Sequence, residues 1–506
     1  MRLTRRTSAL ALAPLLLAGV LGALPATASL QPALPGTLQP WLAQHLSEVT
    51  PTTTLRVLVQ SSTSDRAADA IRAGGLKVQQ KWQLAGMAIG VGPARLVPLV
   101  ASQPGVTYVE GDEPLKLDLD TAHKATRAYQ AERTFRSTNS RVLDGSGVTV
   151  AVIDSGVDSL HPFFQLKGDG LVTTSKVVQN RKNVCGIDLE IDPDVSEACF
   201  ASSPDTDTSS AGGHGTHVAG IVAGVPVKAS NGKSLEGAAP GAKLVMLSVG
   251  AGLSLLDPVA AQNWVLEHWH NPCRSAAQQS TKVVDAACPP IRVTNHSYGP
   301  NGDRVHDPKS AAVKLQQALI RRGVVAVWSA GNAGGNGAVS TTSPDGSDPT
   351  LGVLMVANYS DGGIGDREGA LSSSSSRGQE GKPKTYPDLA APGTKITSSC
   401  RAYMPICSTG LAPLNAGDYN TISGTSMAAP YIAGVVALLF QADPRLTPAK
   451  VEILLEQYAH RFGDTIVERD PSNTRSRTSY DAGHGLVDVY ATLRAICAKN
   501  TGARCR

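Results

Sequence analysis

A serine, a histidine and an aspartate stand in three segments of small and apolar residues, in positions that suit acyl transfer. Ser426 lies in Thr421–Pro430, at a predicted loop-to-helix junction just ahead of the apolar run Tyr431–Phe440. At a helix N-terminus, free backbone N–H groups and the positive end of the dipole favour developing negative charge. A serine hydroxyl is protonated at neutral pH, so it needs a neighbouring base before it can act as a nucleophile.

Two upstream segments offer the base and its acidic partner. Val148–Gly156 reads as a buried strand that ends in the carboxylate of Asp154. Gly213–Gly220 puts His214 at the start of a second helix of small residues. We expect His214 to accept the serine proton and Asp154 to hold the imidazole in the required tautomer.

Four segments, in chain order, resemble the subtilisin-like serine proteases (subtilases). They are the strand ending at Asp154, His214–His217, Ser329–Asn332 and Gly424–Pro430. The resemblance covers about 141–491 and implies a secreted serine endopeptidase with a doubly wound, mostly parallel α/β sheet. It also implies that Asp154, His214 and Ser426 form a catalytic triad. By the same resemblance Asn332 donates to the oxyanion together with the Ser426 N–H, a contact whose loss typically costs about 10²- to 10³-fold in turnover.

The resemblance also points to a binding site for extended protein or peptide substrates. Ser297–Tyr298–Gly299 is similar to the family segment that lines the primary pocket and pairs with substrate as an added strand. The second pocket wall would be Ser329–Ala330–Gly331. His296 and Tyr298 stand where relatives often carry aliphatic residues, so the preference of the pocket is left open.

Other functions have weaker support in the sequence than a serine hydrolase. Taken singly, a serine at a helix start or an aspartate after a strand is often only a cap or turn residue. An exported pseudoprotease or peptide-binding protein on the same fold would be indicated by a substituted triad position, and none is substituted. An α/β-hydrolase esterase has Gly-x-Ser-x-Gly with its acid and base after the serine. Here both partners precede Ser426, and Ala428 stands where the second glycine would be.

Metal sites have little support in the sequence. His214 and His217 could share a helical face, but the Glu of a His-Glu-x-x-His zinc motif is missing. The loop Asp361–Asp366 could hold structural calcium, as relatives often do, although Gly/Asp loops commonly form plain turns. We therefore expect no cofactor for catalysis, and we assign no calcium ligands.

Strands that alternate with helices must position these residues. Short apolar runs predict buried strands, and the helix candidates are Ala311–Arg321 and Pro448–Tyr458. The strand candidates are Val148–Ile153, Leu244–Val249, Ile291–Asn295, Val324–Trp328 and Val353–Ala357. Such alternation indicates a parallel doubly wound sheet, whose active sites form outside the carboxyl ends of the strands. Asp154 and Asn332 both follow a predicted strand.

The N-terminus reads as a targeting segment. Three arginines precede an apolar stretch at about Ala9–Leu24, and Ala26–Thr27–Ala28 fits a cleavage site, so residues 1–28 form a predicted signal peptide. A membrane anchor is disfavoured because the run is short and contains Pro14. We expect a secreted protein, extracellular or periplasmic, with no membrane span in the mature form.

A small α+β domain is predicted at residues 29–113. After a Pro-rich, irregular stretch at Ser29–Thr53, the order β-α-β-β-α-β between Leu55 and Glu110 matches the ferredoxin-like split βαβ pattern. It resembles the inhibitor-type prodomain that precedes many subtilase domains, so the chain's own prodomain is an expected partner. Residues 114–140 then read as a polar linker with the maturation site, and 141–506 as the peptidase domain.

Composition fits a globular protein, and the cysteines fit an exported one. The chain has 506 residues and a net charge of only +4, and aromatic residues are scarce, so neither a polyanion partner nor nucleic-acid binding is indicated. An even number of cysteines in an exported chain indicates disulfides. The simplest pairing is sequential, although others are open and some cysteines could be free: Cys185–Cys199, Cys273–Cys288, Cys400–Cys407 and Cys497–Cys505. Three of these pairs lie in or beside polar stretches expected to be surface insertions, at Lys167–Ser210, Asn271–Cys288 and Ser398–Asp418.

Overall fold

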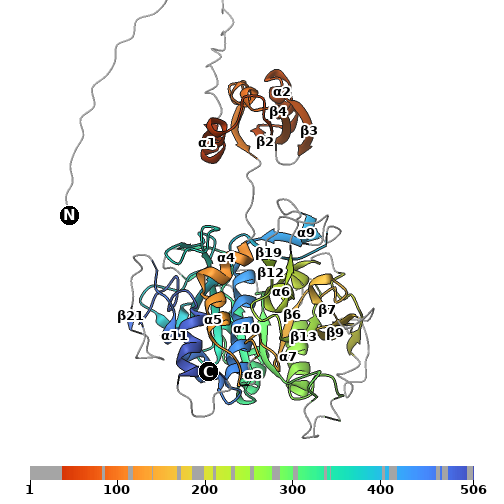
Figure 1. The fold of residues 1–506 in the computed structure, drawn as a ribbon, viewed down its shortest axis with the longest axis vertical. Coiled ribbons are helices and arrows are strands. Elements are labelled where there is room, and N and C mark those ends of the chain that lie inside the picture. Colours follow the sequence, from red (N-terminus) through yellow and green to blue (C-terminus); the bar gives the residue numbers. More distant parts are fainter. Residues whose placement is uncertain are drawn as a thin grey trace, which may run out of the picture. The chain divides into compact units, whose positions relative to one another are not determined.

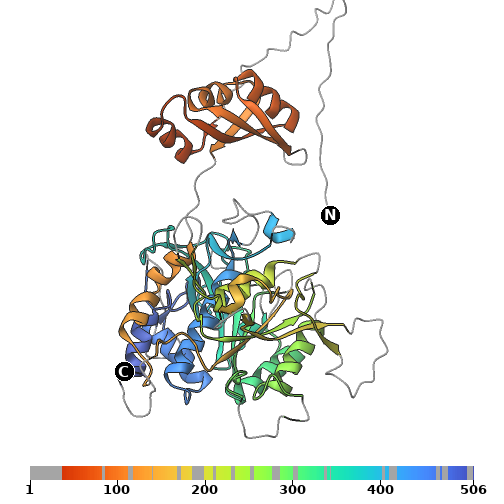
Figure 2. The same ribbon diagram turned by 45° about the vertical axis from the view of Figure 1, so that its right-hand side comes forward.

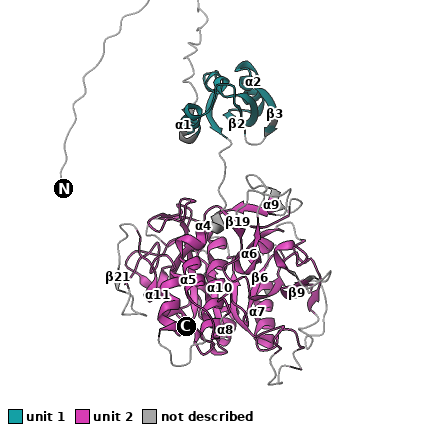
Figure 3. Ribbon diagram, in the orientation of Figure 1, with its two compact units in different colours: residues 1–114 teal, residues 115–506 magenta. Residues whose placement is uncertain are grey.

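The chain forms two compact units, residues 1–114 and 115–506 (Figure 3). The computed structural model describes residues 37–82, 86–111, 118–138, 141–167, 173–184, 199–208, 212–228, 234–250, 256–275, 278, 285–299, 306–335, 339–341, 344–401, 405–408, 419–462, 468–469, 477–498 and 505. Each unit is described by itself.

The first unit is a five-stranded sheet with helices, in the strand order β1-β5-β2-β4-β3. Its elements are β1 (Thr37–Leu38), α1 (Pro40–Glu48), β2 (Thr54–Ser61), α2 (Ser64–Ala73), β3 (Lys77–Trp82), β4 (Met87–Pro93), α3 (Val97–Ala101) and β5 (Val106–Gly111). The order from β2 to β5 is the predicted β-α-β-β-α-β. The stretch Ser29–Thr53, expected to be irregular, instead contains β1 and α1, because Pro40 occupies the first turn of a helix, where proline is tolerated.

The second unit is built on a nine-stranded, mostly parallel sheet. Its strand order is β10-β9-β13-β6-β14-β15-β16-β17, and β18 also pairs with β16. The strands are β6 (Thr149–Asp154), β9 (Val177–Asn183), β10 (Phe200–Ser202), β13 (Lys243–Ser248), β14 (Ile291–His296), β15 (Val325–Ser329), β16 (Val353–Ser360), β17 (Ala370–Leu371) and β18 (Leu389–Pro392). All five predicted strands are present, and the pairs from β9 through β16 to β18 are parallel. The predicted α/β class is confirmed.

Helices cover both faces of this sheet (Figures 1 and 2). Along β6, Val150 and Val152 pack with the layer of α6 and α10, whereas Ala151 and Ile153 pack with the layer of α7 and α8. Both sets of side chains are fully buried, as expected of a central parallel strand with no solvent face. The helices are α6 (His214–Ala223), α7 (Leu256–His268), α8 (Ala311–Arg321), α10 (Thr425–Ala442), α11 (Pro448–Tyr458) and α12 (Val489–Cys497).

Shorter strand pairs surround the main sheet. They are β7 (Gln165–Lys167) with β8 (Thr173–Ser175), β11 (Val227–Lys228) with β12 (Ser234–Leu235), β19 (Ile396–Ser399) with β20 (Tyr419–Ile422), and β21 (Glu468–Arg469) with β22 (Arg477–Thr478). The expected surface insertion at Lys167–Ser210 is wrong in part, because β9 and β10 within it extend the main sheet. β9 was missed because most of its residues are polar and only partly buried, so it does not form an apolar run.

The predicted linker at 114–140 also differs from the structure. It contains α4 (Asp118–Ala125) and α5 (Ala128–Thr134), which belong to the second unit. Ala122 and Ala125 are fully buried, and the Thr126 hydroxyl lies 2.6 Å from the Tyr431 hydroxyl on α10. Arg127 forms an ion pair with the buried carboxylate of Asp488, the N-cap of α12. These helices are therefore an integral part of the second unit.

Disulfides close short loops of the second unit. The structure joins Cys273 to Cys288, Cys400 to Cys407 and Cys497 to Cys505, with Cα–Cα distances of 6.1, 5.6 and 5.2 Å. Cys199 is also disulfide-bonded, and its predicted partner Cys185 lies outside the described residues. One cysteine of the second bridge, Cys407, lies within α9 (Pro405–Ser408).

Helix α10 is long and apolar enough to cross a membrane by length and composition, but 89% of it is buried inside the protein. It contacts α6, β14, β15 and β16, so it is a core helix of the second unit.

Candidate active site

Parallel strand pairing brings the predicted site residues to one edge of the sheet. Asp154 ends β6, and β14 and β15 end at His296 and Ser329. In the register of these strands, Ile153 is opposite His296, and His296 is opposite Trp328. The carboxyl ends of the strands therefore meet at the edge where active sites form in this type of sheet.

Asp154 and His214 are in direct contact. Nδ1 of His214 lies 2.7 Å from Oδ1 of Asp154, and the two side chains are 22% and 4% exposed. Burial lowers the pKa of His214, but the carboxylates of Asp154 and Asp207 raise it, and the net shift is upward. Because Asp154 occupies Nδ1, the other ring nitrogen, Nε2, is the one left to exchange a proton with a substrate or nucleophile.

Ser426 lies in the first turn of α10, immediately after the N-cap Gly424 and Thr425. Its hydroxyl donates to the carbonyl oxygen of Ser297 at 3.1 Å, and the Ser297 hydroxyl donates to the Ser426 carbonyl oxygen at 3.1 Å. Both His214 and Ser426 are among the described residues, and the structure has no hydrogen bond between their side chains. Catalytic hydrogen bonds of this kind commonly tighten only when substrate is bound.

Hydrogen bonds hold the Asn332 side chain beside the first turn of α10, which contains Ser426. Its side-chain oxygen accepts the backbone N–H and the hydroxyl of Thr425, at 2.9 and 3.1 Å. The Thr425 hydroxyl also accepts the N–H of Gly331, whose φ of 103° is in the region that favours glycine. Since the amide oxygen of Asn332 is used on Thr425, its NH₂ group is left to donate elsewhere.

The predicted pocket walls are anchored by a buried aromatic group. His296 stacks on Trp328, and its two ring nitrogens lie 2.7 Å from the Tyr298 hydroxyl and 3.0 Å from the Thr294 hydroxyl. Burial lowers the pKa of His296 to about 3, so this imidazole is neutral at working pH. Of the other predicted wall residues, Ser297, Ser329 and Ala330 are buried, and Gly299 is exposed.

A second buried carboxylate, which the sequence analysis missed, lies behind His214. Asp207 is fully buried and accepts the Ser155 hydroxyl at 2.8 Å and the backbone N–H of Thr216 at 3.1 Å. The Thr216 hydroxyl donates to the same carboxylate. Asp207 stands in a stretch rich in serine, threonine and aspartate, which in sequence resembles an exposed turn, so no local signal distinguishes it.

His214 and His217 do not form a metal pair. Nδ1 of His214 is bonded to Asp154, whereas Nε2 of His217 lies 3.0 Å from the carbonyl oxygen of Asn420 on β20. Burial lowers the pKa of His217 to about 3. The two imidazoles thus serve different partners.

The loop considered for calcium is a hydrogen-bonded turn. The Asp361 carboxylate accepts the N–H of Gly363 at 3.0 Å, and its carbonyl oxygen accepts the N–H groups of Ile364 and Asp366. These contacts are those of a hydrogen-bonded turn.

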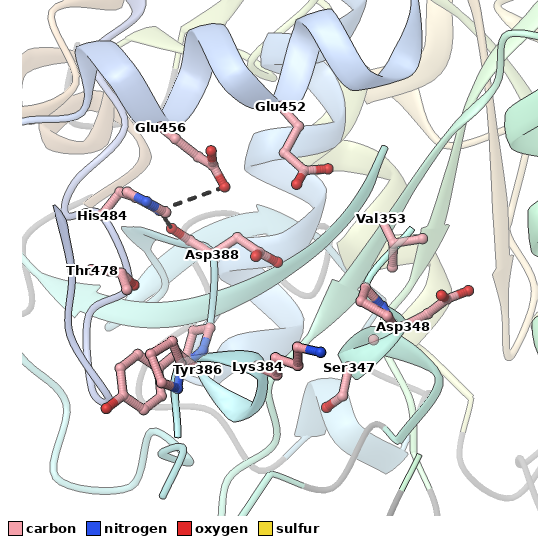
Figure 4. Close-up of a pocket in the computed structure, with 14 residues that line it drawn as sticks. Ser347, Asp348, Val353, Lys384, Tyr386, Asp388, Glu452, Glu456, Thr478 and His484 are labelled. Carbon is pink, nitrogen blue, oxygen red and sulfur yellow. Dashed lines mark hydrogen bonds and ion pairs between the residues drawn. The ribbon is translucent and has the colours of Figure 1, made fainter. Parts of the chain in front are cut away.

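A different group of acids, away from the triad, has the spacing of a cation site. The ligand atoms of Asp388, Glu452 and Glu456 all lie within 4.8 Å of one another, and Figure 4 shows them at a pocket beside His484. Each carboxylate already has a protein partner. Asp388 accepts the Met355 N–H, Glu452 accepts the Gly352 N–H, and Glu456 lies 3.6 Å from His484. Each of the three carboxylates thus lies beside a protein donor or a histidine.

Comparison with known proteins gives a single consistent family. A sequence model of the subtilase family matches residues 145–485. The serine protease AprX of Bacillus subtilis (strain 168) is 28% identical over 379 residues, 74% of each chain. Subtilisin E of the same organism is 26% identical over 442 residues, 86% of this chain and 88% of subtilisin E. The crystal structure of fervidolysin from Fervidobacterium pennivorans aligns with 23% identity and a TM-score of 0.48, covering 88% of this chain and 61% of that one.

Proposed function

The chain belongs to the subtilase family and is a serine endopeptidase, and we propose that Asp154, His214 and Ser426 carry out its chemistry. The observation that supports this assignment most directly is the 2.7 Å contact between Asp154 and His214 at the carboxyl edge of the sheet. Ser426, at the start of α10, supplies the hydroxyl at a helix N-terminus, where developing negative charge is favoured.

In the proposed reaction, Ser426 Oγ attacks the carbonyl carbon of the scissile peptide bond. Its proton passes to Nε2 of His214, and the imidazolium is stabilised by the carboxylate of Asp154. When the tetrahedral intermediate collapses, the C–N bond breaks and His214 gives the proton to the leaving amine. Water, activated by the same imidazole, then hydrolyses the acyl-enzyme ester and restores the serine hydroxyl.

For this step the Ser426 hydroxyl must leave the Ser297 carbonyl oxygen, to which it donates in the unliganded geometry, and turn toward His214. The oxyanion is proposed to accept the side-chain NH₂ of Asn332 and the backbone N–H of Ser426. The Asn332 amide has the correct orientation for this role because Thr425 takes its oxygen.

Substrates are proposed to be proteins or peptides that bind in extended form along Ser297–Gly299, with Ser329–Gly331 as the second wall of the primary pocket. No cofactor takes part in the proposed chemistry. Buried His296 and Trp328, with partly buried Tyr298, make these walls more polar than aliphatic side chains would.

We propose that the protein is exported through the signal peptide at 1–28 and made as an inactive precursor. The first unit, in this proposal, is a prodomain that occupies the cleft until it is cut away. The burial of Ala122 and Ala125 and the Thr126–Tyr431 contact support a mature enzyme that keeps α4 and α5. The cut is therefore proposed to fall before Asp118, within the early part of the expected 114–140 segment.

The alternative is a pseudoprotease or peptide-binding protein on the same fold. A fluorophosphonate probe, which labels an activated serine covalently, separates the two. The mature protein should be labelled at Ser426, and Ser426→Ala should be neither labelled nor active, since loss of a triad serine costs about 10⁶-fold in turnover. Labelling at another serine, or peptide hydrolysis by Ser426→Ala above about a thousandth of the wild-type rate, would exclude the assignment.

A further inference from the structure

Asp207 is a fully buried carboxylate in the loop that leads into α6, next to the proposed catalytic histidine. Its partners are the hydroxyl and the N–H of Thr216, the hydroxyl of Ser155 and the backbone of Gly213. Burial raises the pKa of the Asp207 carboxyl, whereas these hydrogen bonds lower it, because a buried charge is costly unless several donors satisfy it. All of these donors are sequence neighbours of the contacting pair: Ser155 follows Asp154, and Gly213 and Thr216 flank His214.

Ser155 connects the two carboxylates. Its backbone N–H donates to Oδ1 of Asp154 at 2.7 Å, and its hydroxyl donates to Oδ1 of Asp207 at 2.8 Å. The same hydroxyl accepts the N–H of Gly215 at 2.9 Å. The Asp207–Ser155 pair therefore binds the backbone on both sides of His214, at Gly213, Gly215 and Thr216.

The helix has no other cap at this end. Gly213 is the N-cap with a φ of 96°, and no side chain of its own closes the first turn of α6. The first N–H groups of the helix would otherwise point inward without an acceptor. Asp207 and Ser155 take that place, and the close approach of Gly215 to Gly156, where an added Cβ would lie 2.2 Å from the Gly156 carbonyl oxygen, leaves no room for the turn to shift.

We propose that Asp207 is a positioning residue for peptide hydrolysis, which holds the start of α6 so that His214 faces Asp154 and which adds a second negative charge to stabilise the imidazolium. The inference rests on the proposed triad, because it needs His214 to be the base. Asp207 itself acts through Ser155, Gly213 and Thr216 and does not contact the substrate.

Three titratable groups bear on His214. Asp154 contacts it, Asp207 lies behind it, and His217 follows on the same helix but is neutral because burial lowers its pKa to about 3. Burial lowers the pKa of His214, and the two carboxylates raise it. Loss of the Asp207 charge should therefore lower the pKa of His214 and move the acidic limb of the pH profile of kcat/KM to lower pH, because that limb reports the free enzyme's base.

The experiment compares Asp207→Asn, which removes the charge but keeps the shape, with Ser155→Ala, which removes the bridge but keeps the charge. Glu380→Gln, an exposed carboxylate, controls for the change in net charge. Each full-length precursor is matured with a trace of affinity-tagged wild type, which is then withdrawn. Rates of peptide hydrolysis are expressed per active site, titrated with the fluorophosphonate probe, so that unfolded protein does not count.

We expect Asp207→Asn to lose about 10- to 100-fold in kcat with little change in KM, in line with the cost of a small misplacement of a catalytic group. Its acidic limb should move to lower pH. Ser155→Ala should also have a lower kcat, but the acidic limb of its kcat/KM profile should lie at the wild-type pH. Glu380→Gln should match wild type in kcat and in the position of the acidic limb.

Two results would overturn the inference. One is an Asp207→Asn enzyme whose kcat per active site stays within about twofold of wild type. The other is a lower kcat with an unmoved acidic limb, which would make Asp207 a residue of the fold alone. If wild type itself is not labelled at Ser426, the triad assignment fails instead, so the two failures can be told apart.

Discussion

The imidazole of His296 lies flat on the indole of Trp328, with ring centroids 4.1 Å apart and ring planes 10° from parallel. These residues are adjacent across β14 and β15, and each precedes one proposed wall of the primary pocket. The Trp328 N–H donates to the side-chain oxygen of Gln316 on α8 at 3.0 Å, which anchors the indole of the stack. The geometry of the proposed pocket should therefore depend on these side chains behind its backbone.

Tyr298→Phe tests this dependence. The change deletes the hydroxyl that lies 2.7 Å from Nδ1 of His296 and leaves that buried nitrogen without its partner. We expect a loss of about 1–3 kcal/mol in the free energy of unfolding, the usual cost of an unsatisfied buried polar group. KM should rise for peptides that fill the pocket, with kcat changed by less than about threefold, since the triad is untouched.

The measurements are denaturant unfolding in the Ser426→Ala background and steady-state kinetics in the active enzyme. Tyr458→Phe, on α11, is the matched control and should behave as wild type. A large fall in kcat at constant KM would mean that Tyr298 supports the nucleophile and not the pocket.

Self-processing is the second prediction. Wild type expressed in a protease-poor host should lose the first unit and show a new N-terminus before Asp118, because the connector is tethered near its own active site. Ser426→Ala should keep the segment, as read by intact mass and N-terminal sequencing. If the inactive variant is trimmed at the same bond, another protease does the work. A new N-terminus beyond Asp118 would contradict the role given to α4 and α5.

Strands and motifs of this protein were predictable from sequence because their signals are local. β6, β13, β14, β15 and β16 are short apolar runs buried on both faces, and parallel sheets require that composition. The Asp154–His214 contact follows from small-residue motifs at the ends of β6 and the start of α6. Their spatial meeting was inferred from the rule that carboxyl ends of parallel strands share one edge.

Features that depend on distant partners were not predictable. α4 and α5 look like a polar connector in sequence, and the surface on which they are buried comes from residues far along the chain, among them Tyr431 and Asp488. Asp207 was not predictable for the same reason, since its donors lie just after β6 and at the start of α6 and its own neighbours in sequence resemble a turn. In each case the decisive contact joins segments that no sequence window contains.

Lys176 gives a prediction about pH. Its amine is buried and donates to the carbonyl oxygens of Ala223 and Pro240, and burial lowers its pKa from 10.5 to about 7. Between these two values the unfolded chain binds more protons than the folded one, so the free energy of unfolding should rise with pH from about 7 to about 10. The slope should reach at most about 1.4 kcal/mol per pH unit.

Denaturant unfolding across this pH range, in the Ser426→Ala background to prevent autolysis, measures the slope. Lys176→Met should flatten it, whereas the exposed Lys228→Met should not. An equal slope in all three proteins would show that Lys176 keeps its charge in the folded state.

The acids at the pocket of Figure 4 give the last prediction. Asp388, Glu452 and Glu456 have ligand atoms within 4.8 Å of one another, and Glu452 and Glu456 are only 5% and 4% exposed. Like charges this close in a buried site repel each other. Glu452→Gln removes one charge and keeps a carbonyl oxygen that can accept the Gly352 N–H. We expect it to raise the free energy of unfolding by about 1 kcal/mol at pH 8 in the presence of EDTA, because one like-charge contact is lost.

Thermal unfolding in the Ser426→Ala background, with EDTA or with millimolar calcium, measures both the effect and its alternative. Glu380→Gln should leave Tm unchanged, because that carboxylate is exposed. With no cation at this group, calcium should affect wild type and Glu452→Gln alike. If instead calcium raises the Tm of wild type and Glu452→Gln loses that gain, the three carboxylates hold a cation through oxygen ligands of the kind calcium prefers. In that case the Glu452 carboxylate stabilises the folded protein when calcium is bound. Glu452→Gln would then be more stable than wild type in EDTA and less stable than wild type in calcium.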